Sequence, residues 1–403
     1  GLLTVLLATL SERRREMAIL RSVGAGPRHV LGLLLLEALV LATLGALFGL
    51  VLLQLLVASL SPWLQASYGI VVNLAWPSAV EWTLLAVVVG AAGLVGQVQP
   101  LAVIRLDQPN ARFEPALYSA VSRGTESLVF QGKVPQSQWQ AMRAPFQGGF
   151  FPAPLKYGYI NVGLVEDGSL PAGTPIFCLY PHQDRYVVPA EAVTPLPAGL
   201  PPQRAVLAAN METAINGLWD AAPLVGDRIA VIGAGVVGCL VAFLASRLPG
   251  AQVELIDIDP AKAAIAEALG IPFALTRDAS READIVIHAS GNPMGLQGAL
   301  TLAAYEATIL EMSWYGSTLV PLPLGEEFHS KRLILKSSQV GGVSPARRAR
   351  RGYADRMALA LSLLADDRLD ALISGESPFE ELPDLMPTLA SNPAGTLCHR
   401  IRY

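Results

Sequence analysis

Residues 227–238 read DRIAVIGAGVVG, a β-branched run that leads directly into a glycine-rich turn. Gly233, Gly235 and Gly238 have G-x-G-x-x-G spacing, and the small-residue segment VVGCLVAFLASRL that follows predicts a helix. A second predicted strand, AQVELIDID (251–259), places Asp257 19 residues after the last glycine. A glycine-rich turn between a strand and a helix, with an acid on the next strand, is the fingerprint of a dinucleotide-binding domain.

Each residue of this fingerprint has a physical reason. Gly233 permits the tight turn, Gly235 lets the backbone approach a pyrophosphate, and Gly238 lets helix and strand pack closely. Asp257 can accept hydrogen bonds from both ribose hydroxyls and would repel a 2′-phosphate, so the prediction is NAD(H). The alternatives are a glycine turn of another α/β protein and a purely strand-capping Asp257. The predicted cofactor-binding residues are Gly233, Ala234, Gly235, Val236, Val237, Gly238, Asp257, Ile258, Ser290 and Gly291.

The pattern of strand and helix continues toward the C-terminus. Predicted strands at 283–291, 308–316 and 332–342 alternate with predicted helices at 260–270 and 295–304. This alternation favours a parallel, doubly wound sheet, whose strand ends line the cofactor crevice. The same edge would then hold His288, which is interpreted either as a packed strand-end residue or as a catalytic one.

Residues 111–205 have a different composition, rich in Gly, Pro and β-branched residues. Short strands are predicted in YINVGLVE (159–166) and RYVVPAEAV (185–193). This segment therefore predicts a compact β domain in front of the nucleotide-binding domain.

The order of these parts resembles the medium-chain dehydrogenase/reductase, or zinc-type alcohol dehydrogenase-like, superfamily. The segments that carry the resemblance are SAVSRGTESLVFQGKVP (119–135), FPAPLKYGYINVGLVE (151–166), ETAINGLWDAAPLVGDRIAVIGAGVVG (212–238) and LIDIDPAK (255–262). It implies an α/β fold with a GroES-like β domain (111–205), a Rossmann domain (206–345) and a C-terminal return segment (346–403). The resemblance also implies a β domain that is truncated at its N-terminal side.

The run S-x-G-T-E at 122–126 is similar to a zinc-lacking subgroup that includes bacteriochlorophyllide-type dehydrogenases. The zinc-ligand positions of the superfamily fall at Ser122, at Tyr159 and near Ala208 or Ala209. A catalytic zinc needs three N, S or O protein ligands, so no metal is predicted. Another group must then handle the alcohol proton, and the candidates are Tyr159, Glu126, His182 and Ser122. A packed aromatic, a capping carboxylate and a loop histidine are the structural alternatives for the first three.

The N-terminal quarter has the composition of a membrane segment. The whole chain is 52% hydrophobic and 15% charged, and between Arg28 and Glu81 the only charged residue is Glu37. Residues 31–60 and 82–104 are each long enough to span a bilayer, and residues 1–10 resemble the end of a third span. A buried helix of a globular protein is the alternative. Five arginines in 11–29 place that segment, and residues 106–403, on the cytoplasmic side of an inner membrane.

The run ERRREMAILRSVGAGPRHVLGLLLLEALVL (12–41) resembles the C-terminal membrane domain of FtsX-like ABC-transporter permeases. The resemblance covers residues 1–105 and implies an all-α transmembrane fragment, with an ABC ATPase as partner of segment 11–29. The chain begins inside a hydrophobic run, which we interpret as a fragment boundary. A fusion of two neighbouring genes, or a membrane-tethered enzyme, would explain the two unlike parts.

The favoured function is an NAD(H)-dependent oxidoreductase acting on a small alcohol or carbonyl substrate, fused to a permease fragment. The alternatives are a permease fragment with a non-catalytic nucleotide-binding domain and a membrane-bound redox sensor. Residues 111–403 carry a net charge of −5, which gives no support to nucleic-acid binding. The superfamily resemblance is also compatible with a homo-oligomer.

Overall fold

The computed structural model describes residues 44–45, 48–49, 52, 56–60, 101–105 (backbone only), 118–391 and 395–403. The chain divides into two compact units, Gly1–Gln99 and Pro100–Tyr403. Within the first unit the described residues are helical. None of the helices that the structure describes is long and apolar enough to cross a membrane. The predicted span at 1–10, residues 82–100 of the predicted span 82–104, most of 31–60, and segment 11–29 lie outside the described residues.

The first strand of the second unit corrects one boundary of the sequence analysis. Leu101–Arg105 forms strand β1, although residues 82–104 were expected to form a membrane-spanning helix. Strand β1 pairs antiparallel with β5 (Asn161–Gly168) and with β7 (Arg185–Pro189). The sequence LAVIR is apolar and β-branched, which suits a central strand as well as a membrane helix, and pairing on both sides decides for the strand. The β domain therefore draws a strand from a segment predicted to belong to the permease part.

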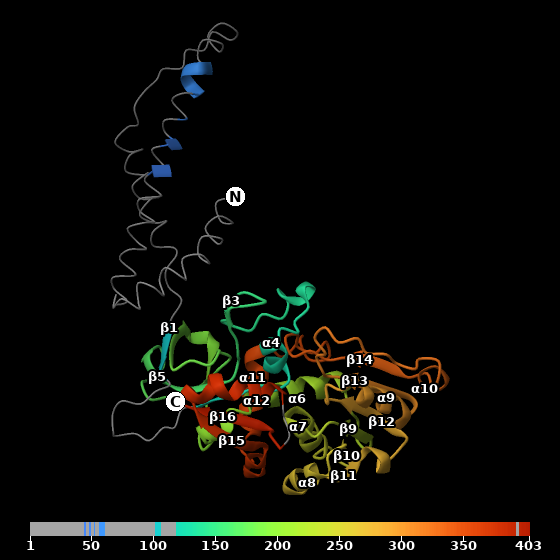
Figure 1. Ribbon diagram of the computed structural model, residues 1–403. Coiled ribbons are helices and arrows are strands. Elements are labelled where there is room, and N and C mark those ends of the chain that lie inside the picture. Colours follow the sequence, from blue (N-terminus) through green and yellow to red (C-terminus); the bar gives the residue numbers. More distant parts are fainter. Residues whose placement is uncertain are drawn as a thin grey trace. The chain divides into compact units, whose positions relative to one another are not determined.

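The β domain is built on a mixed sheet with the strand order β15-β16-β2-β5-β1-β7. Strand β6 pairs with β5 on one side and with β8 on the other. The two last strands of the chain complete this sheet, because β16 pairs antiparallel with β2 and parallel with β15. Figure 1 shows β15 and β16 next to each other. The remaining strands are β2 (Tyr118–Val121), β6 (Pro175–Cys178), β8 (Val193–Pro195), β15 (Ile373–Pro378), β16 (Cys398–Arg402) and the small β3 (Gly148–Gly149) and β4 (Leu155–Lys156) pair.

The predicted nucleotide-binding part is a six-stranded, fully parallel sheet with the order β11-β10-β9-β12-β13-β14. In sequence terms this is 3-2-1-4-5-6, the doubly wound order of dinucleotide-binding domains. The strand order reverses between β9 and β12, and a ligand crevice is expected at the carboxyl ends of these strands. The strands are β9 (Arg228–Ile232), β10 (Gln252–Asp257), β11 (Phe273–Leu275), β12 (Ala283–His288), β13 (Ala303–Glu311) and β14 (Ile334–Ser337).

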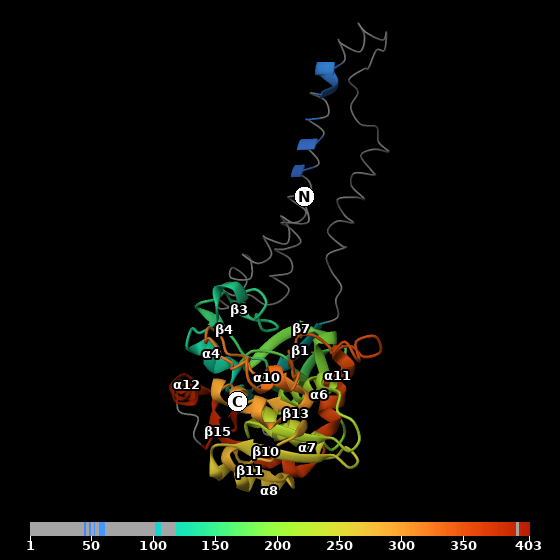
Figure 2. The ribbon, with the colours of Figure 1, turned by 90° about the vertical axis from the view of Figure 1, so that its right-hand side faces the viewer.

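Helices cover both faces of the parallel sheet. Ile229 and Val231 of β9 pack into the main core with the helices that precede and follow this strand, whereas Ala230 and Ile232 pack on the opposite face. The alternation follows from the two-residue period of a strand. Figure 2 shows β10, β11 and α8 far from the β3–β4 pair. The helices are α4 (Thr125–Phe130), α5 (Pro202–Ala205), α6 (Ala208–Ala221), α7 (Val236–Ala245), α8 (Ala263–Leu269), α9 (Pro293–Leu302), α10 (Glu327–Ser330), α11 (Tyr353–Leu363) and α12 (Leu382–Ser391).

A buried ion pair joins α6 to α11. Arg356 donates through Nε to Glu212 at 3.1 Å and through its two terminal nitrogens to Asn216 Oδ1 at 2.5 Å and Val340 O at 2.6 Å. Both charged side chains are almost fully buried. This contact ties the C-terminal segment to the nucleotide-binding domain. Short 3-10 turns at Gln136–Gln138, Ala190–Ala192, Pro260–Lys262, Thr276–Asp278, Asp367–Leu372 and Phe379–Glu381 complete the described secondary structure.

Candidate active site

The glycine-rich turn has the geometry that its sequence predicts. Gly233 has φ +104°, and a Cβ at this position would lie 2.7 Å from the backbone N and Cα of Ser290. A Cβ on Gly238 would lie 1.8 Å from the carbonyl oxygen of Gly233. At Gly235, which is exposed, a Cβ would have no neighbour within 4 Å. Gly233 and Gly238 are therefore required by the protein's own packing, whereas Gly235 leaves space beside the first turn of α7.

Asp257 lies at the end of β10 and is held against this turn. One carboxylate oxygen accepts a hydrogen bond from the N–H of Ala234 at 2.7 Å, and the other accepts from the N–H of Asp259 at 3.0 Å. Asp257 thus caps the turn, and its half-buried carboxylate stands beside the exposed Ile258. The structure brings it to the edge where Gly235 is open, together with Val236 and Val237, which begin α7.

The carboxyl ends of β12 and β13 carry a second polar cluster, which extends beyond the predicted Ser290 and Gly291. His288 is fully buried and contacts Glu311 Oε2 through Nδ1 at 2.8 Å and Ser290 Oγ through Nε2 at 2.6 Å. The Gly291 N–H donates to Ser313 Oγ at 3.0 Å. His288 is packed in the core, but its ring also connects the exposed Ser290 to the carboxylate of Glu311.

The four predicted catalytic candidates come together in the β domain. Tyr159 donates to Ser122 Oγ at 2.5 Å, and the backbone N–H of Ser122 donates to Glu126 Oε1 at 2.8 Å. Glu126 Oε2 lies 2.9 Å from His182 Nε2. A Cβ on Gly158, at φ +123°, would lie 3.1 Å from the His182 ring, so glycine makes room for this contact.

Two members of this network were not predicted. Ser119 Oγ lies 2.7 Å from His182 Nδ1 and 2.9 Å from the hydroxyl of Tyr403, the last residue of the chain. Ser119 belongs to strand β2 and lies three residues before Ser122, and this closeness in sequence is the one signal that could have pointed to it. Tyr403 is separated from Ser119 by 284 residues, and only the pairing of β16 with β2 brings it there.

Burial sets the protonation of the aromatic hydroxyls. Burial, reinforced by the nearby Glu126 carboxylate, raises the pKa of Tyr159 to about 12. The pKa of Tyr157, whose ring meets that of Tyr159 edge-on at 6.3 Å, is raised mainly by burial as well. A phenol with a raised pKa keeps its proton at neutral pH. Tyr159 is therefore a hydrogen-bond donor in this site.

The loop after β13 joins the strand ends to the β domain. The N–H of Ser317 donates to the carbonyl of Lys133 at 3.1 Å, and a Cβ on Gly316 would lie 2.4 Å from the same oxygen. Trp314 packs with Tyr157 in a small core of the β domain. The edge that carries the glycine turn and the β domain that carries Tyr159 are therefore in direct contact.

The donor set does not suit a catalytic zinc. Among the residues that the structure describes, no three His, Cys, Asp or Glu side chains converge on one point. Ser122 and Tyr159 bring hydroxyl groups to this site, and Ala208 and Ala209 at the buried start of α6 offer no donor atom. A catalytic zinc requires three protein ligands. Glu126 and His182 do meet, but they bond to each other.

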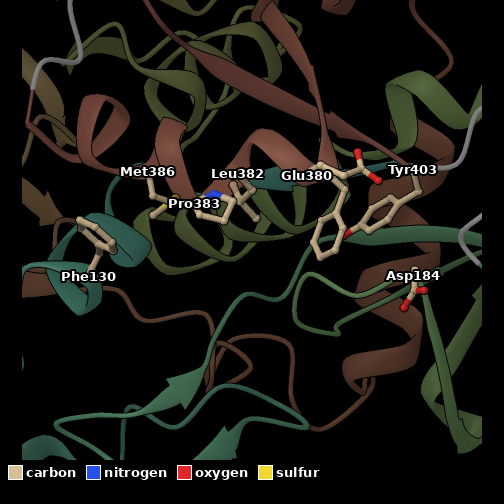
Figure 3. A pocket seen from close by; sticks show the side chains of 8 residues that line it. Phe130, Asp184, Glu380, Leu382, Pro383, Met386 and Tyr403 are labelled. Carbon is tan, nitrogen blue, oxygen red and sulfur yellow. The ribbon is translucent and has the colours of Figure 1, made fainter. Parts of the chain in front are cut away.

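A pocket of about 530 Å³ lies beside this network. Figure 3 shows Tyr403 and Asp184 at one end of it and Phe130 and Met386 at the other. Its wall is mainly apolar and comes from α4, α12 and the 3-10 turn before α12. The pocket contacts the network through Tyr403 and does not include the glycine turn.

Comparison with known proteins gives different answers for the two parts of the chain. The family model for the FtsX-like permease C-terminal domain matches residues 1–103. An uncharacterized zinc-type alcohol dehydrogenase-like protein from Haemophilus influenzae is 27% identical over 223 residues, which cover 52% of this chain and 61% of that protein. The chain thus spans about three fifths of this relative. D-guloside 3-dehydrogenase from Escherichia coli is 27% identical over 245 residues, covering 53% and 69% respectively.

Solved structures agree on the fold. L-idonate 5-dehydrogenase from Escherichia coli superimposes with a TM-score of 0.57 at 15% identity, over 76% of this chain and 91% of that one. At TM-scores of 0.56, a short chain alcohol dehydrogenase from Escherichia coli, 15% identical, was solved with NADH, and a protein described as a zinc-binding dehydrogenase from Sinorhizobium meliloti, 16% identical, was solved with NADP. Each match covers 76% of this chain and 100% of the neighbour. The described α/β part has the Rossmann and GroES-like dehydrogenase fold. The relatives and solved neighbours named here are dehydrogenases, and the likeness to the solved structures is one of fold.

Proposed function

We propose that residues 100–403 form an NAD(H)-dependent oxidoreductase that interconverts an alcohol and a carbonyl compound without zinc. The observation that carries the proposal is the turn at Gly235. There the protein leaves open space at the start of α7, while Asp257 is fixed on the same edge. The dehydrogenase fold of the solved neighbours supports it independently.

The cofactor is proposed to be NAD(H) rather than NADP(H). The N-terminal N–H groups of α7 would hold the pyrophosphate, because a helix N-terminus attracts anions. Asp257 would accept from the ribose hydroxyls, and its charge disfavours a 2′-phosphate. When bound, the nicotinamide supplies the hydride acceptor or donor.

Proton transfer is assigned to Tyr159 and Ser122. Tyr159 is a protonated donor that contacts Ser122 Oγ, so Ser122 keeps its own proton free to donate to a substrate oxygen. In carbonyl reduction, Ser122 would give its proton to the developing alkoxide and take one from Tyr159, and the half-buried Tyr159 would then regain a proton from solvent. Glu126 accepts a hydrogen bond from the backbone N–H of Ser122, and His182 hydrogen-bonds to Glu126. These two residues therefore position the hydroxyls of Ser122 and Tyr159.

The substrate class is proposed from the relatives. D-guloside 3-dehydrogenase and L-idonate 5-dehydrogenase are named for the oxidation of secondary hydroxyls on sugar-like molecules. We therefore expect secondary alcohols of polyols and sugar derivatives rather than simple primary alcohols.

The test of the cofactor assignment uses the full chain in detergent. NADH and NADPH fluorescence titrations should show tighter NADH binding, and Asp257→Asn should remove that preference. Asp278→Asn is the matched control, because Asp278 is exposed and pairs with its neighbour Arg277. Turnover is then followed by nicotinamide absorbance with a panel of polyols. An Asp257→Asn protein that keeps the wild-type preference would exclude the assigned role.

For the N-terminal unit, we propose a membrane-embedded permease fragment that keeps residues 106–403 on the cytoplasmic side. The match of residues 1–103 to the permease family model supports this proposal. An ABC ATPase that contacts segment 11–29 and a homo-oligomer through the dehydrogenase part are the partners we propose. Membrane fractionation, followed by co-purification with and without residues 11–29, tests both the location and the ATPase.

A further inference from the structure

The polar cluster at the ends of β12 and β13 has the connectivity of a serine nucleophile with its base. Ser290 Oγ lies 2.6 Å from His288 Nε2, and the opposite ring nitrogen of His288 lies 2.8 Å from Glu311 Oε2. A nucleophile bonded to a base, with the base oriented by a third group, is how such sites are recognised on unrelated folds. These three residues play no part in the proton transfer assigned above.

The carboxylate of Glu311 is held in its charged form. The backbone N–H of Ser313 donates to Oε1 at 2.6 Å, and the hydroxyl of Tyr315 donates to Oε2 at 2.9 Å. Burial alone would raise the pKa of Glu311, but the hydrogen bonds from His288 and Ser313 outweigh it and lower the pKa. A carboxylate accepts only, so Nδ1 of His288 carries the ring proton and Nε2 is left to accept from Ser290.

The position of the three groups matches their roles. His288 is fully buried, Glu311 is largely buried, and Ser290 is exposed at the strand end. A Cβ on Gly295 of α9 would lie 2.6 Å from both His288 Nε2 and Ser290 Oγ, so glycine at this position leaves room for the contact. The N–H of Asn292 donates to Ser290 Oγ at 3.2 Å, which favours negative charge on that oxygen.

We propose that Ser290 is an activated nucleophile that gives the protein an acyl-transfer activity toward small activated esters. Ser290 Oγ forms a bond to the ester carbonyl carbon while His288 Nε2 takes its proton. The tetrahedral intermediate then expels the alcohol, which receives that proton, and an acyl-serine remains. Water, deprotonated by His288, releases the carboxylic acid and restores the hydroxyl. Glu311 is a positioning residue that orients the imidazole.

The nucleophile lies next to the glycine turn. A Cβ on Gly233 would meet the backbone of Ser290 at 2.7 Å, so the turn into α7 and Ser290 share one edge of the sheet. The positive end of α7 favours the anion that develops during acyl transfer. The same edge is the proposed dinucleotide site, so NADH should protect Ser290. This protection rests on the proposed function, whereas the nucleophile itself does not.

The experiment uses diisopropyl fluorophosphate and p-nitrophenyl acetate with the full chain, in the absence of cofactor. Mass spectrometry of the digested protein should place the adduct on the peptide that contains Ser290. Ser290→Ala should abolish the adduct and the release of p-nitrophenol. Ser362→Ala should retain both, because Ser362 is an exposed helix residue whose hydroxyl bonds only to Leu359 O within the described part of the chain.

Three further variants test the base and its orientation. His288→Gln should slow labelling by about 100-fold or more, the usual size of general-base assistance. Gly295→Ala should slow it as well, since it forces His288 and Ser290 apart, and circular dichroism confirms that each variant is folded. Glu311→Gln should change the pH profile of labelling, which a purely structural role would not do.

The outcomes are distinguishable from those of the proposed function. No adduct on Ser290, or labelling at equal rates in wild type and folded His288→Gln, overturns the nucleophile. Labelling of Ser290 that NADH does not slow leaves the nucleophile intact and counts against the dinucleotide site.

Discussion

Substitution by alanine should have different effects at two glycines of the same turn. Gly235→Ala should mainly weaken NADH binding, whereas Gly238→Ala should mainly lower the free energy of unfolding. Gly235 has extended backbone angles, φ −79° and ψ 179°, that alanine adopts freely, and its Cβ would have no neighbour within 4 Å. Because Gly235 is the N-cap of α7, where glycine is preferred over alanine, Gly235→Ala should cost at most about 1 kcal/mol in the free energy of unfolding. If a dinucleotide occupies that open space, the added methyl group meets the ligand and not the protein.

The expected loss of NADH affinity follows from overpacking. Forcing an extra methyl group into a well-packed contact costs about 1–3 kcal/mol. At about 1.4 kcal/mol per factor of ten, NADH should bind Gly235→Ala roughly 5- to 150-fold more weakly than wild type. A fluorescence titration of the full chain measures this change directly.

Gly238→Ala should destabilise the protein itself, in contrast to Gly235→Ala. Its Cβ would lie 1.8 Å from the carbonyl oxygen of Gly233, so α7 or the turn must move. We expect a loss of at least about 1–3 kcal/mol in the free energy of unfolding, measured with urea. Gly298→Ala is the matched control, because Gly298 lies within α9 and its Cβ would also meet nothing within 4 Å. Alanine there should stabilise by up to about 1 kcal/mol and leave NADH binding unchanged.

Two results would refute this reasoning. Unchanged NADH affinity in Gly235→Ala would mean that no ligand occupies the open side of the turn. Unchanged stability in Gly238→Ala would mean that the close packing of helix and turn is not as the structure has it.

Three further predictions concern other parts of the molecule. Tyr159→Phe should lower kcat by about 100- to 10,000-fold with NADH affinity intact, because it removes only the phenol donor; steady-state kinetics and titration separate the two. Arg356→Met should cost about 3–5 kcal/mol in urea unfolding, since it leaves the Glu212 carboxylate buried and unpaired. Hydrogen bonds from Arg368 outweigh burial and lower the pKa of Asp366 from 3.8 to about 2. The ionised Asp366 carboxylate therefore stabilises the folded state fully above about pH 4, and this stabilisation is lost as the pH falls toward 2. It should stay below about 1 kcal/mol because the pair is partly exposed, and acid unfolding of Asp366→Asn should lack it.

The sequence predicted the nucleotide-binding domain well because its signals are local. The spacing of Gly233, Gly235 and Gly238 and the position of Asp257 depend on a few residues of chain and on the requirements of one tight turn. The parallel sheet and its doubly wound order followed from the alternation of strands and helices. The resemblance also brought Ser122, Glu126, Tyr159 and His182 into one candidate set, and the structure joins them by hydrogen bonds.

The same sequence misjudged the secondary structure of residues 101–104, which were predicted to end a membrane-spanning helix but lie in strand β1. An apolar, β-branched segment suits both a membrane helix and a central strand, and its own composition does not choose between them. Pairing with β5 and β7, which come from residues 161–168 and 185–189, decides for the strand. A choice of this kind depends on partners that are distant in sequence.

By itself, then, the sequence determined the glycine-rich turn and the class of fold, and it predicted the residue types of the candidate site. Only the tertiary structure decided which of those residues touch. Tyr403 reaches Ser119 across 284 residues, and His288 becomes a link between Ser290 and Glu311 because β12 and β13 are neighbours in the sheet. The physical reason is the distance along the chain over which each interaction acts. Turn and helix preferences are set by neighbours along the chain, whereas hydrogen-bond partners between strands are set by sheet order and register.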